Sequence, residues 1–193
     1  MKRMFNLLAV VLFSFALVGS AQAYTLNSVD LEQQIGVFGA YQNTDDQDDG
    51  YGGGLRYAVF GNVAEPANVS PLKSVDIGFD LRGSWLTQYD EDYLDTDMYP
   101  VQANLLLRTE FKNGFRPYAG GGAGYAWFDG DGKAELDDEY TYSALLGVDQ
   151  AITDQVSVFV EGEYMWLEPD FENSSGDVDL SGFGANAGVN FNF

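Results

Sequence analysis

Eight segments of the chain carry apolar or small side chains at every second position, with mostly polar or charged residues between them. In an extended strand, residues two apart point to the same face, so this alternation is typical of amphipathic β-strands. The pattern therefore predicts an all-β protein. The predicted strands lie within residues 35–41, 55–63, 75–85, 99–111, 119–127, 140–148, 156–166 and 181–193.

The two faces of these predicted strands differ in charge. One face carries no charged residue in any segment, whereas the other holds acids, arginines, amides and glycines. A soluble sandwich would bury the apolar face and expose the polar one. A transmembrane barrel has the opposite arrangement, with apolar side chains toward lipid and polar side chains in the lumen.

Strand length, aromatic placement and the connections favour the membrane barrel over the soluble sandwich. Several segments approach the roughly 9 to 11 residues that a tilted strand needs to cross a bilayer. Aromatic residues gather near strand ends, as in the two interfacial girdles of such barrels. The predicted fold is an eight-stranded antiparallel up-and-down transmembrane β-barrel. The aromatic residues are Tyr41, Trp85, Tyr99, Trp127, Tyr140 and Trp166 at one end, and Phe111, Phe191 and Phe193 at the other.

The connections between strands alternate in length and charge. On one side two links are tight, and Asn113-Gly114 is a strong hairpin-turn signal, whereas the third link, at residues 65–73, is longer. On the other side, four longer links together hold 20 acidic residues and the single base Lys133. Because outer-membrane barrels have short periplasmic turns and longer outer loops, we expect these four acidic loops to face outward. The acidic loops lie at residues 43–51, 88–98, 129–139 and 168–179.

The first 23 residues have the layout of a secretory signal peptide. Lys2 and Arg3 precede an apolar stretch at residues 7–18, and Ala21-Gln22-Ala23 matches a cleavage site. A membrane anchor is the alternative, but the apolar stretch is about half the roughly 20 residues that a spanning helix needs. We expect residues 1–23 to be removed and residues 24–193 to form one outer-membrane barrel domain.

Composition narrows the possible chemistry. The chain has a formal net charge of −21 and contains neither cysteine nor histidine. These absences exclude disulfides and thiol nucleophiles, and they remove the usual general base and the commonest zinc ligand. The negative charge argues against a nucleic-acid partner, whose phosphates would be repelled. The sequence predicts no enzyme activity and no cofactor.

Nine charged residues on the polar face form the candidate site inside the predicted lumen. The simplest interpretation is a structural network of ion pairs that compensates buried charges. The alternative is a narrow, cation-preferring pore in which an arginine–carboxylate pair acts as the gate. Glu161 and Glu163 could also serve as paired acid–base groups, but we expect arginines beside them. The nine residues are Arg56, Asp76, Asp80, Arg82, Arg108, Glu110, Asp149, Glu161 and Glu163.

Two acidic loop segments superficially resemble calcium-binding loops. Residues 45–50 and 129–132 are rich in aspartate and glycine. Neither has the glutamate that closes an EF-hand loop at its twelfth position, where this chain has Arg56 or Tyr140. We interpret the loops as solvated, mutually repelling surfaces. Weak binding of divalent cations, including bridges to lipopolysaccharide, is the alternative.

Three segments resemble the small outer-membrane barrels of the OmpA, OmpX and opacity-protein type. Residues 115–125 combine a Pro-Tyr pair with alternating glycines, residues 152–157 are similar to the penultimate hairpin of these proteins, and the chain ends in Phe191-Asn192-Phe193. The resemblance implies a bacterial outer-membrane protein, in contact with lipid and lipopolysaccharide, that supports envelope integrity or adhesion through its outer loops. It also implies that Phe191 and Phe193 form the C-terminal signal for the outer-membrane assembly machinery.

Overall fold

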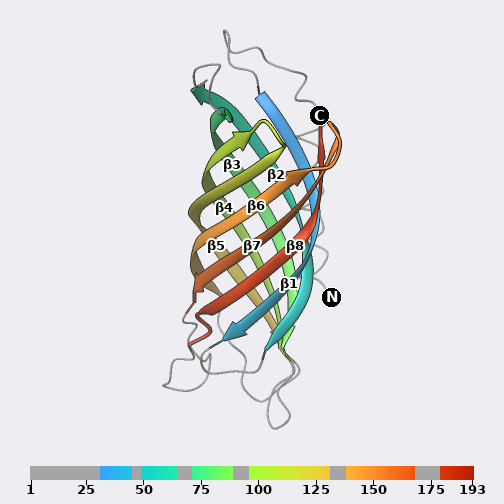
Figure 1. Cartoon of the computed structure of the whole chain (residues 1–193). Coiled ribbons are helices and arrows are strands. Elements are labelled where there is room, and N and C mark those ends of the chain that lie inside the picture. The colour runs from blue at the N-terminus through green and yellow to red at the C-terminus, as the bar shows by residue number, and fades with distance from the viewer. Residues whose placement is uncertain (1–30, 45–48, 65–70, 89–95, 131–137, 168–178) are drawn as a thin grey trace.

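Eight antiparallel strands close into a barrel in the structure, which is a computed structural model (Figure 1). Each strand pairs with its neighbours in chain order and β1 pairs with β8, which confirms the predicted up-and-down barrel. The structure describes residues 31–44, 49–64, 71–88, 96–130, 138–167 and 179–193. The strands are β1 (Leu31–Thr44), β2 (Gly50–Ala64), β3 (Leu72–Gln88), β4 (Thr96–Phe111), β5 (Phe115–Gly130), β6 (Glu139–Ala151), β7 (Val156–Trp166) and β8 (Gly182–Asn192).

Pairing of the first and last strands removes both edges of the sheet. The register of β1 and β8 runs from Gln34 opposite Asn192 to Thr44 opposite Gly182. Beyond it, the backbones of Gln33 and Phe193 exchange hydrogen bonds of 3.3 and 3.0 Å. A closed sheet leaves no row of unpaired backbone groups, which a strand in lipid could not tolerate.

The predicted hairpin at Asn113-Gly114 joins β4 to β5. Gly114 has a φ of +77°, a left-handed conformation that glycine adopts without a steric cost. Its N–H donates to the carbonyl of Phe111 at 3.0 Å, and the side-chain oxygen of Asn113 accepts from the N–H of Phe115 at 3.2 Å. This turn lies at the same end of the barrel as the C-terminus, the upper end in Figure 1.

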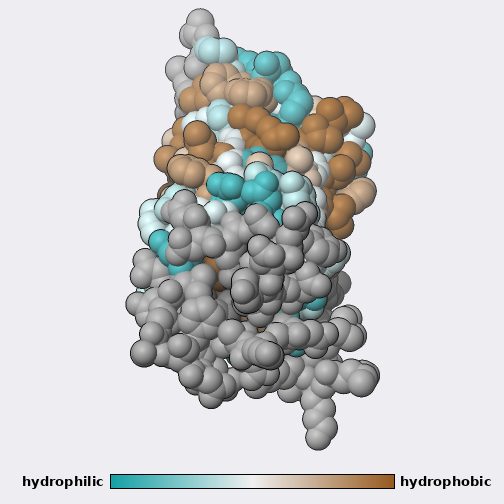
Figure 2. Space-filling view, turned by 90° about the horizontal axis from the view of Figure 1, so that it is seen from below, coloured by the Kyte–Doolittle hydropathy of each residue, from teal (hydrophilic) through white to brown (hydrophobic). Residues whose placement is uncertain are grey.

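The outward face of the barrel is apolar and the inward face is largely polar. On β4, Leu105 is 67% exposed while its neighbour Asn104 is 1% exposed. The same alternation runs through all eight strands, and hydrophobic residues predominate on the described wall in Figure 2. An exposed apolar surface of this extent suits a hydrocarbon solvent and would aggregate in water.

Aromatic pairs mark the two ends of this apolar wall. Near the loop ends of the strands, the rings of Tyr41 and Tyr51 lie 5.2 Å apart and those of Tyr164 and Trp166 lie 4.8 Å apart, measured between centroids. At the opposite end, Phe111 and Phe115 contact each other at 6.0 Å. Rings at these positions suit the two membrane–water interfaces.

The predicted signal peptide, residues 1–23, lies outside the described residues. Among the described residues, no helix is long and apolar enough to cross a bilayer.

Replacing an outward-facing leucine tests which face meets lipid. We expect Leu105→Arg to lower the free energy of unfolding by about 2–4 kcal/mol, because a charge near the bilayer centre must be buried in hydrocarbon. The measurement is urea-dependent unfolding of vesicle-inserted protein, followed by tryptophan fluorescence.

Asn43→Arg is the matched control, because this outward position lies at the loop end of β1. Its expected loss is at most about 1 kcal/mol. Equal, negligible losses for both variants would mean that the apolar wall faces water, since exposed substitutions in a soluble protein stay within about 0.5 kcal/mol.

Candidate functional site

Two arginines and three acids meet in the lumen about halfway along the barrel, and we call them the middle cluster. Arg82 donates through Nε to Asp80 at 2.7 Å and through both terminal nitrogens to Glu161 at 2.5 and 3.2 Å. Arg56 donates through two nitrogens to the other oxygen of Asp80, each at 2.9 Å. Asp80 is fully buried, so this pairing offsets a large desolvation cost. The middle cluster consists of Arg56, Asp80, Arg82, Glu161 and Glu163.

Neutral side chains occupy the remaining hydrogen-bonding positions of Asp80 and Glu161. The Tyr118 hydroxyl donates to Glu161 at 3.0 Å, and the Asn186 amide donates to the other Glu161 oxygen at 3.1 Å. The Asn104 amide donates to Asp80 at 3.2 Å. Burial of Asp80 and Glu161 is tolerated because each oxygen of these two carboxylates accepts a hydrogen bond.

Glu163 is the surplus acid of the middle cluster, which holds two guanidinium groups against three carboxylates. Its oxygens accept from the amides of Gln102 at 2.8 Å and Asn186 at 3.1 Å. The nearest guanidinium nitrogen, on Arg82, is 3.8 Å away and already donates to Glu161. Glu163 therefore depends mainly on neutral donors.

A second group of charges fills the lumen near the end that carries the short turns, and we call it the inner cluster. Arg108 binds Asp76 and Glu32, both at 2.9 Å. Arg116 binds Glu32 at 3.2 Å and Glu110 at 3.0 Å. Glu32 thus bridges two arginines across the barrel. The inner cluster consists of Glu32, Asp76, Arg108, Glu110, Arg116 and Asp149, and Lys73, whose side chain is largely exposed, binds Glu110 at its edge.

Asp149 in the inner cluster resembles Glu163 in the middle cluster, because neither carboxylate has a guanidinium group within hydrogen-bonding distance. One of its oxygens accepts from Ser157 at 2.6 Å and Asn190 at 2.8 Å. The other oxygen is buried, forms no hydrogen bond and lies 3.7 Å from Arg116. Each cluster therefore contains one carboxylate that is held mainly by hydroxyl or amide donors.

The structure places all nine candidate residues in the lumen and divides them between the two clusters. The nine candidates do not include Glu32, Lys73 or Arg116, although all three contribute ion pairs. Arg116 could have been found, because it is in phase with the inward-facing Tyr118. Glu32 is likewise in phase with the inward-facing Gln34, and the strand begins earlier than the alternation suggested.

The lumen is more apolar than the sequence analysis predicted. A belt of apolar side chains separates the two clusters, with the Arg108 guanidinium 3.7 Å from the centre of the Phe60 ring. On the other side of the belt, Arg56 lies 4.8 Å from the centre of the Phe159 ring. Stacking on aromatic faces stabilises these buried cations in addition to their ion pairs. The belt includes Ala58, Phe60, Leu106, Tyr118 and Leu145.

A second apolar group, which we call the plug, is buried in the lumen on the loop side of the middle cluster. Leu167 and Leu180 flank the last loop, and the Leu180 N–H donates to the Leu167 carbonyl at 2.9 Å. Both side chains are buried, and each is at most 1% exposed. The plug consists of Leu86, Met98, Ala126, Phe128, Met165, Leu167 and Leu180.

Residues 45–48 and 131–132 of the two acidic loop segments lie outside the described residues, so both the solvated-surface interpretation and the alternative of weak cation binding stay predictions. Within the described part of the chain, no group of three or more acidic side chains is arranged to hold a metal ion.

The sequence from residue 7 to residue 191 matches the family model described as the outer membrane protein beta-barrel domain. The chain belongs to this family. Together with the apolar outer wall, this membership places the protein in the bacterial outer membrane. Family membership alone does not distinguish adhesins, pores and purely structural barrels, because one fold hosts many functions.

Solved structures of small outer-membrane barrels share this fold. Neisserial surface protein A is 14% identical, with a TM-score of 0.61 over 86% of this chain and 100% of its own. OprG from Pseudomonas aeruginosa is 14% identical, with a TM-score of 0.59 over 84% and 95% of the two chains. Ail, the attachment invasion locus protein of Yersinia pestis, is 14% identical, with a TM-score of 0.56 over 84% and 97%.

One curated relative is similar over part of its length. The 56 kDa type-specific antigen of Orientia tsutsugamushi is 34% identical over 102 residues. The match covers 52% of this chain and 19% of the antigen, so this chain spans about a fifth of that relative.

Substitutions of two glutamates on the same strand test whether stability depends on the pairing of a buried charge or only on its presence. Glu161→Gln should lower the free energy of unfolding by about 3–5 kcal/mol, because it leaves Arg82 buried without its bidentate partner. Glu163→Gln should leave stability within about 1 kcal/mol of the wild type or raise it, because it removes the surplus charge.

Urea titrations of the two variants in detergent micelles measure this difference. The substitutions are chemically identical and the residues are two apart on one face, so each variant is a control for the other. Equal losses would show that Glu163 is paired as strongly as Glu161.

Proposed function

We propose that this protein is a structural and surface-interaction barrel whose lumen is closed and whose outer loops make the functional contacts. The packing of side chains inside the lumen supports this proposal most directly. The plug and the middle cluster lie in series, so a solute would have to displace packed apolar side chains and then break buried ion pairs. Both steps are costly, because core side chains are close-packed and a buried charge without its partner is strongly destabilising.

A narrow pore is the second candidate function. Glu163 and Asp149 favour it, since surplus carboxylates on either side of the apolar belt would attract cations. The gate would be Arg82, which lies 3.8 Å from Glu163 while it binds Glu161. Opening would also require the plug to move.

Enzyme activity has little support from the lumen residues. The sequence lacks histidine, and Glu161 is saturated by Arg82, Tyr118 and Asn186. A general acid or base needs access to a substrate proton, which this packing denies.

The acidic loops point to contacts with lipopolysaccharide through divalent cations. Ail, a structural neighbour, has also been solved with the heparin analogue sucrose octasulfate, in a structure that is 10% identical to this chain with a TM-score of 0.55. That ligand is a polyanion. Loops with 20 acidic residues would repel a polyanion, so we propose that the loops of this chain accept cation-bridged or cationic surfaces instead.

Export and assembly complete the proposal. Residues 1–23 would direct secretion and be removed. Phe191 and Phe193 are 52% and 62% exposed at the end of the last strand. These accessible rings suit recognition by the assembly machinery before the barrel enters the membrane.

Planar-bilayer recording separates the closed barrel from the pore. We expect the refolded wild-type protein to give no steady conductance steps, because the plug and the middle cluster both block the lumen. A general porin in the same bilayers serves as the positive control. Steady, cation-selective steps that change in Arg82→Ala or Glu161→Gln would instead establish the pore.

Binding experiments with two anionic probes test the role of the loops. We expect no binding of sucrose octasulfate by calorimetry at about 0.15 M salt, where charge repulsion still acts over about 8 Å. We expect vesicles that contain lipopolysaccharide to stabilise the barrel in Mg²⁺ and to lose most of this effect in EDTA.

A variant with the loop acids changed to Asn and Gln provides the comparison for both probes. It should lose the Mg²⁺-dependent stabilisation while keeping the barrel intact. Tight binding of sucrose octasulfate by the wild type, or the same stabilisation with and without Mg²⁺, would contradict the proposed loop chemistry.

A further inference from the structure

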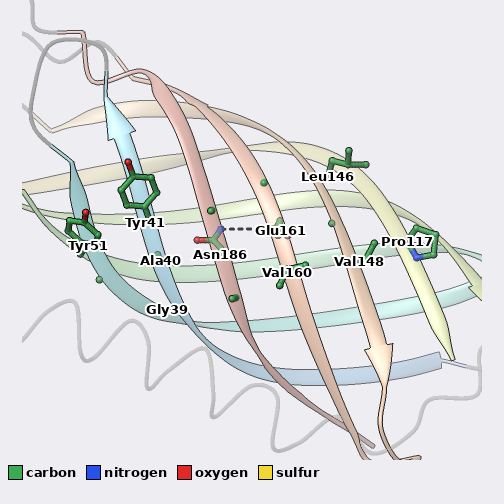
Figure 3. A pocket seen from close by; sticks show the side chains of 15 residues that line it. Gly39, Ala40, Tyr41, Tyr51, Pro117, Leu146, Val148, Val160, Glu161 and Asn186 are labelled. Carbon is green, nitrogen blue, oxygen red and sulfur yellow. Dashed lines mark hydrogen bonds between the residues drawn. The ribbon is translucent and has the colours of Figure 1, made fainter.

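A shallow groove crosses the outer wall of the barrel where β1, β8 and β7 meet (Figure 3). Its floor consists of small, outward-facing residues, namely Gly39, Gly162, Ala185 and Ala187. Elsewhere the same wall carries large exposed side chains such as Leu105 and Phe79. The groove is therefore a recess in the lipid-facing surface, and it is deep where glycine and alanine replace the large side chains found elsewhere on the wall.

The strand register gives the groove a direction. Gly39 lies opposite Ala187, which lies opposite Val160 on the next strand, and Val160 lies opposite Val148. The row therefore passes from β1 through β8 and β7 to β6, and Pro117 on β5 continues it. From β2 to β5 it crosses five strand spacings, or about 24 Å.

The two floor glycines are not required by the packing of the protein itself. A Cβ atom added to Gly39 or Gly162 would find its nearest atom at 4.0 Å, which is ordinary contact distance. By contrast, a Cβ on Gly53, beside Gly39 on β2, would come within 2.8 Å of a backbone oxygen. Glycine weakens a strand. A glycine that the internal packing does not require often marks a place where another molecule approaches the backbone closely.

The two ends of the groove differ in polarity. At the end nearer the acidic loops, Tyr41 and Tyr51 face each other, and the Asn43 amide donates to Asp49 at 2.8 Å just beyond them. Pro117 and Val148 lie at the other end, nearer the short turns, where the groove lining offers no hydroxyl. The recess thus matches an amphiphile whose polar group lies at the loop-side interface and whose chain runs toward the middle of the bilayer.

From these observations we infer that the groove is a binding site for one acyl chain of an outer-leaflet lipid. The groove is continuous with the apolar wall that faces lipid, so hydrocarbon is the medium around it. A flexible chain fills a long recess whose lining atoms would otherwise lose their contacts. The acyl chain follows the row of small residues, and the tyrosine pair contacts the polar part of the same lipid.

Photo-crosslinking locates the bound chain. The full mature barrel is reconstituted in vesicles of phosphatidylethanolamine and phosphatidylglycerol that contain a phosphatidylethanolamine with a diazirine in one acyl chain. We expect labelling at residues 39–41, 160–162 and 185–187 to exceed labelling at residues 103–105, on the bulkier wall of β4, by at least about threefold.

Filling the groove should abolish this preference. Gly39→Val combined with Gly162→Val places branched side chains on the floor, and labelling there should fall to the level of residues 103–105. Gly83→Val is the matched control, because Gly83 also faces outward with room for a Cβ, its nearest atom lying 3.6 Å away, but lies outside the groove. A heat-modifiable band on unboiled gels verifies that each barrel is folded, and Ala187→Leu replaces the double variant if that variant does not fold.

Two results would overturn the inference. Equal labelling of the groove and of β4 in the wild type would make the groove ordinary lipid-facing surface. A dimer of the wild type in analytical ultracentrifugation that is lost on filling the groove would assign the recess to a second copy of the chain.

Discussion

Closure of the sheet between β1 and β8 is the constraint on which the rest of the structure depends. In hydrocarbon, an unpaired backbone group has no water to bond, so a sheet with edges would be unstable there. Closure gives every strand a hydrogen-bonded neighbour on each side. It also creates an interior that must be filled. With eight strands, the interior is just wide enough for side chains. The contents of the lumen follow from this geometry rather than from any single motif.

The lumen is filled in layers that alternate between charge and hydrocarbon. The inner cluster, the apolar belt, the middle cluster and the plug follow one another from the turn end to the loop end. Arginine suits such layers because its guanidinium binds carboxylates with several nitrogens and also stacks on rings, as Arg108 does on Phe60. The layers combine ion pairing with close packing, and this combination is what closes the barrel to solutes in our proposal.

The size of the outward-facing side chains varies around the outer wall of the barrel. Its apolar character follows from the membrane, but its relief varies from strand to strand. Large side chains on β3 and β4 contrast with glycine and alanine on β1, β7 and β8. The proposed lipid site arises from this variation, and it lies on the opposite side of the wall from the middle cluster. The acidic loops supply a third surface, so the barrel offers separate places for structure, lipid contact and outward interaction.

Period-two alternation determined the strand number and the composition of the two faces, whereas strand length, aromatic placement and the connections determined the inside-out character of the fold. A side chain's face depends only on its position along its own strand, so it can be read locally. The pairing of Arg82 with Glu161, 79 residues apart in sequence, could not be read this way. It depends on the stagger between strands and on barrel closure, which bring distant positions to one depth. For the same reason, only the tertiary structure decided that Leu167 and Leu180 join one buried cluster, that Glu32 binds two arginines, and that Gly39 and Gly162 line one groove.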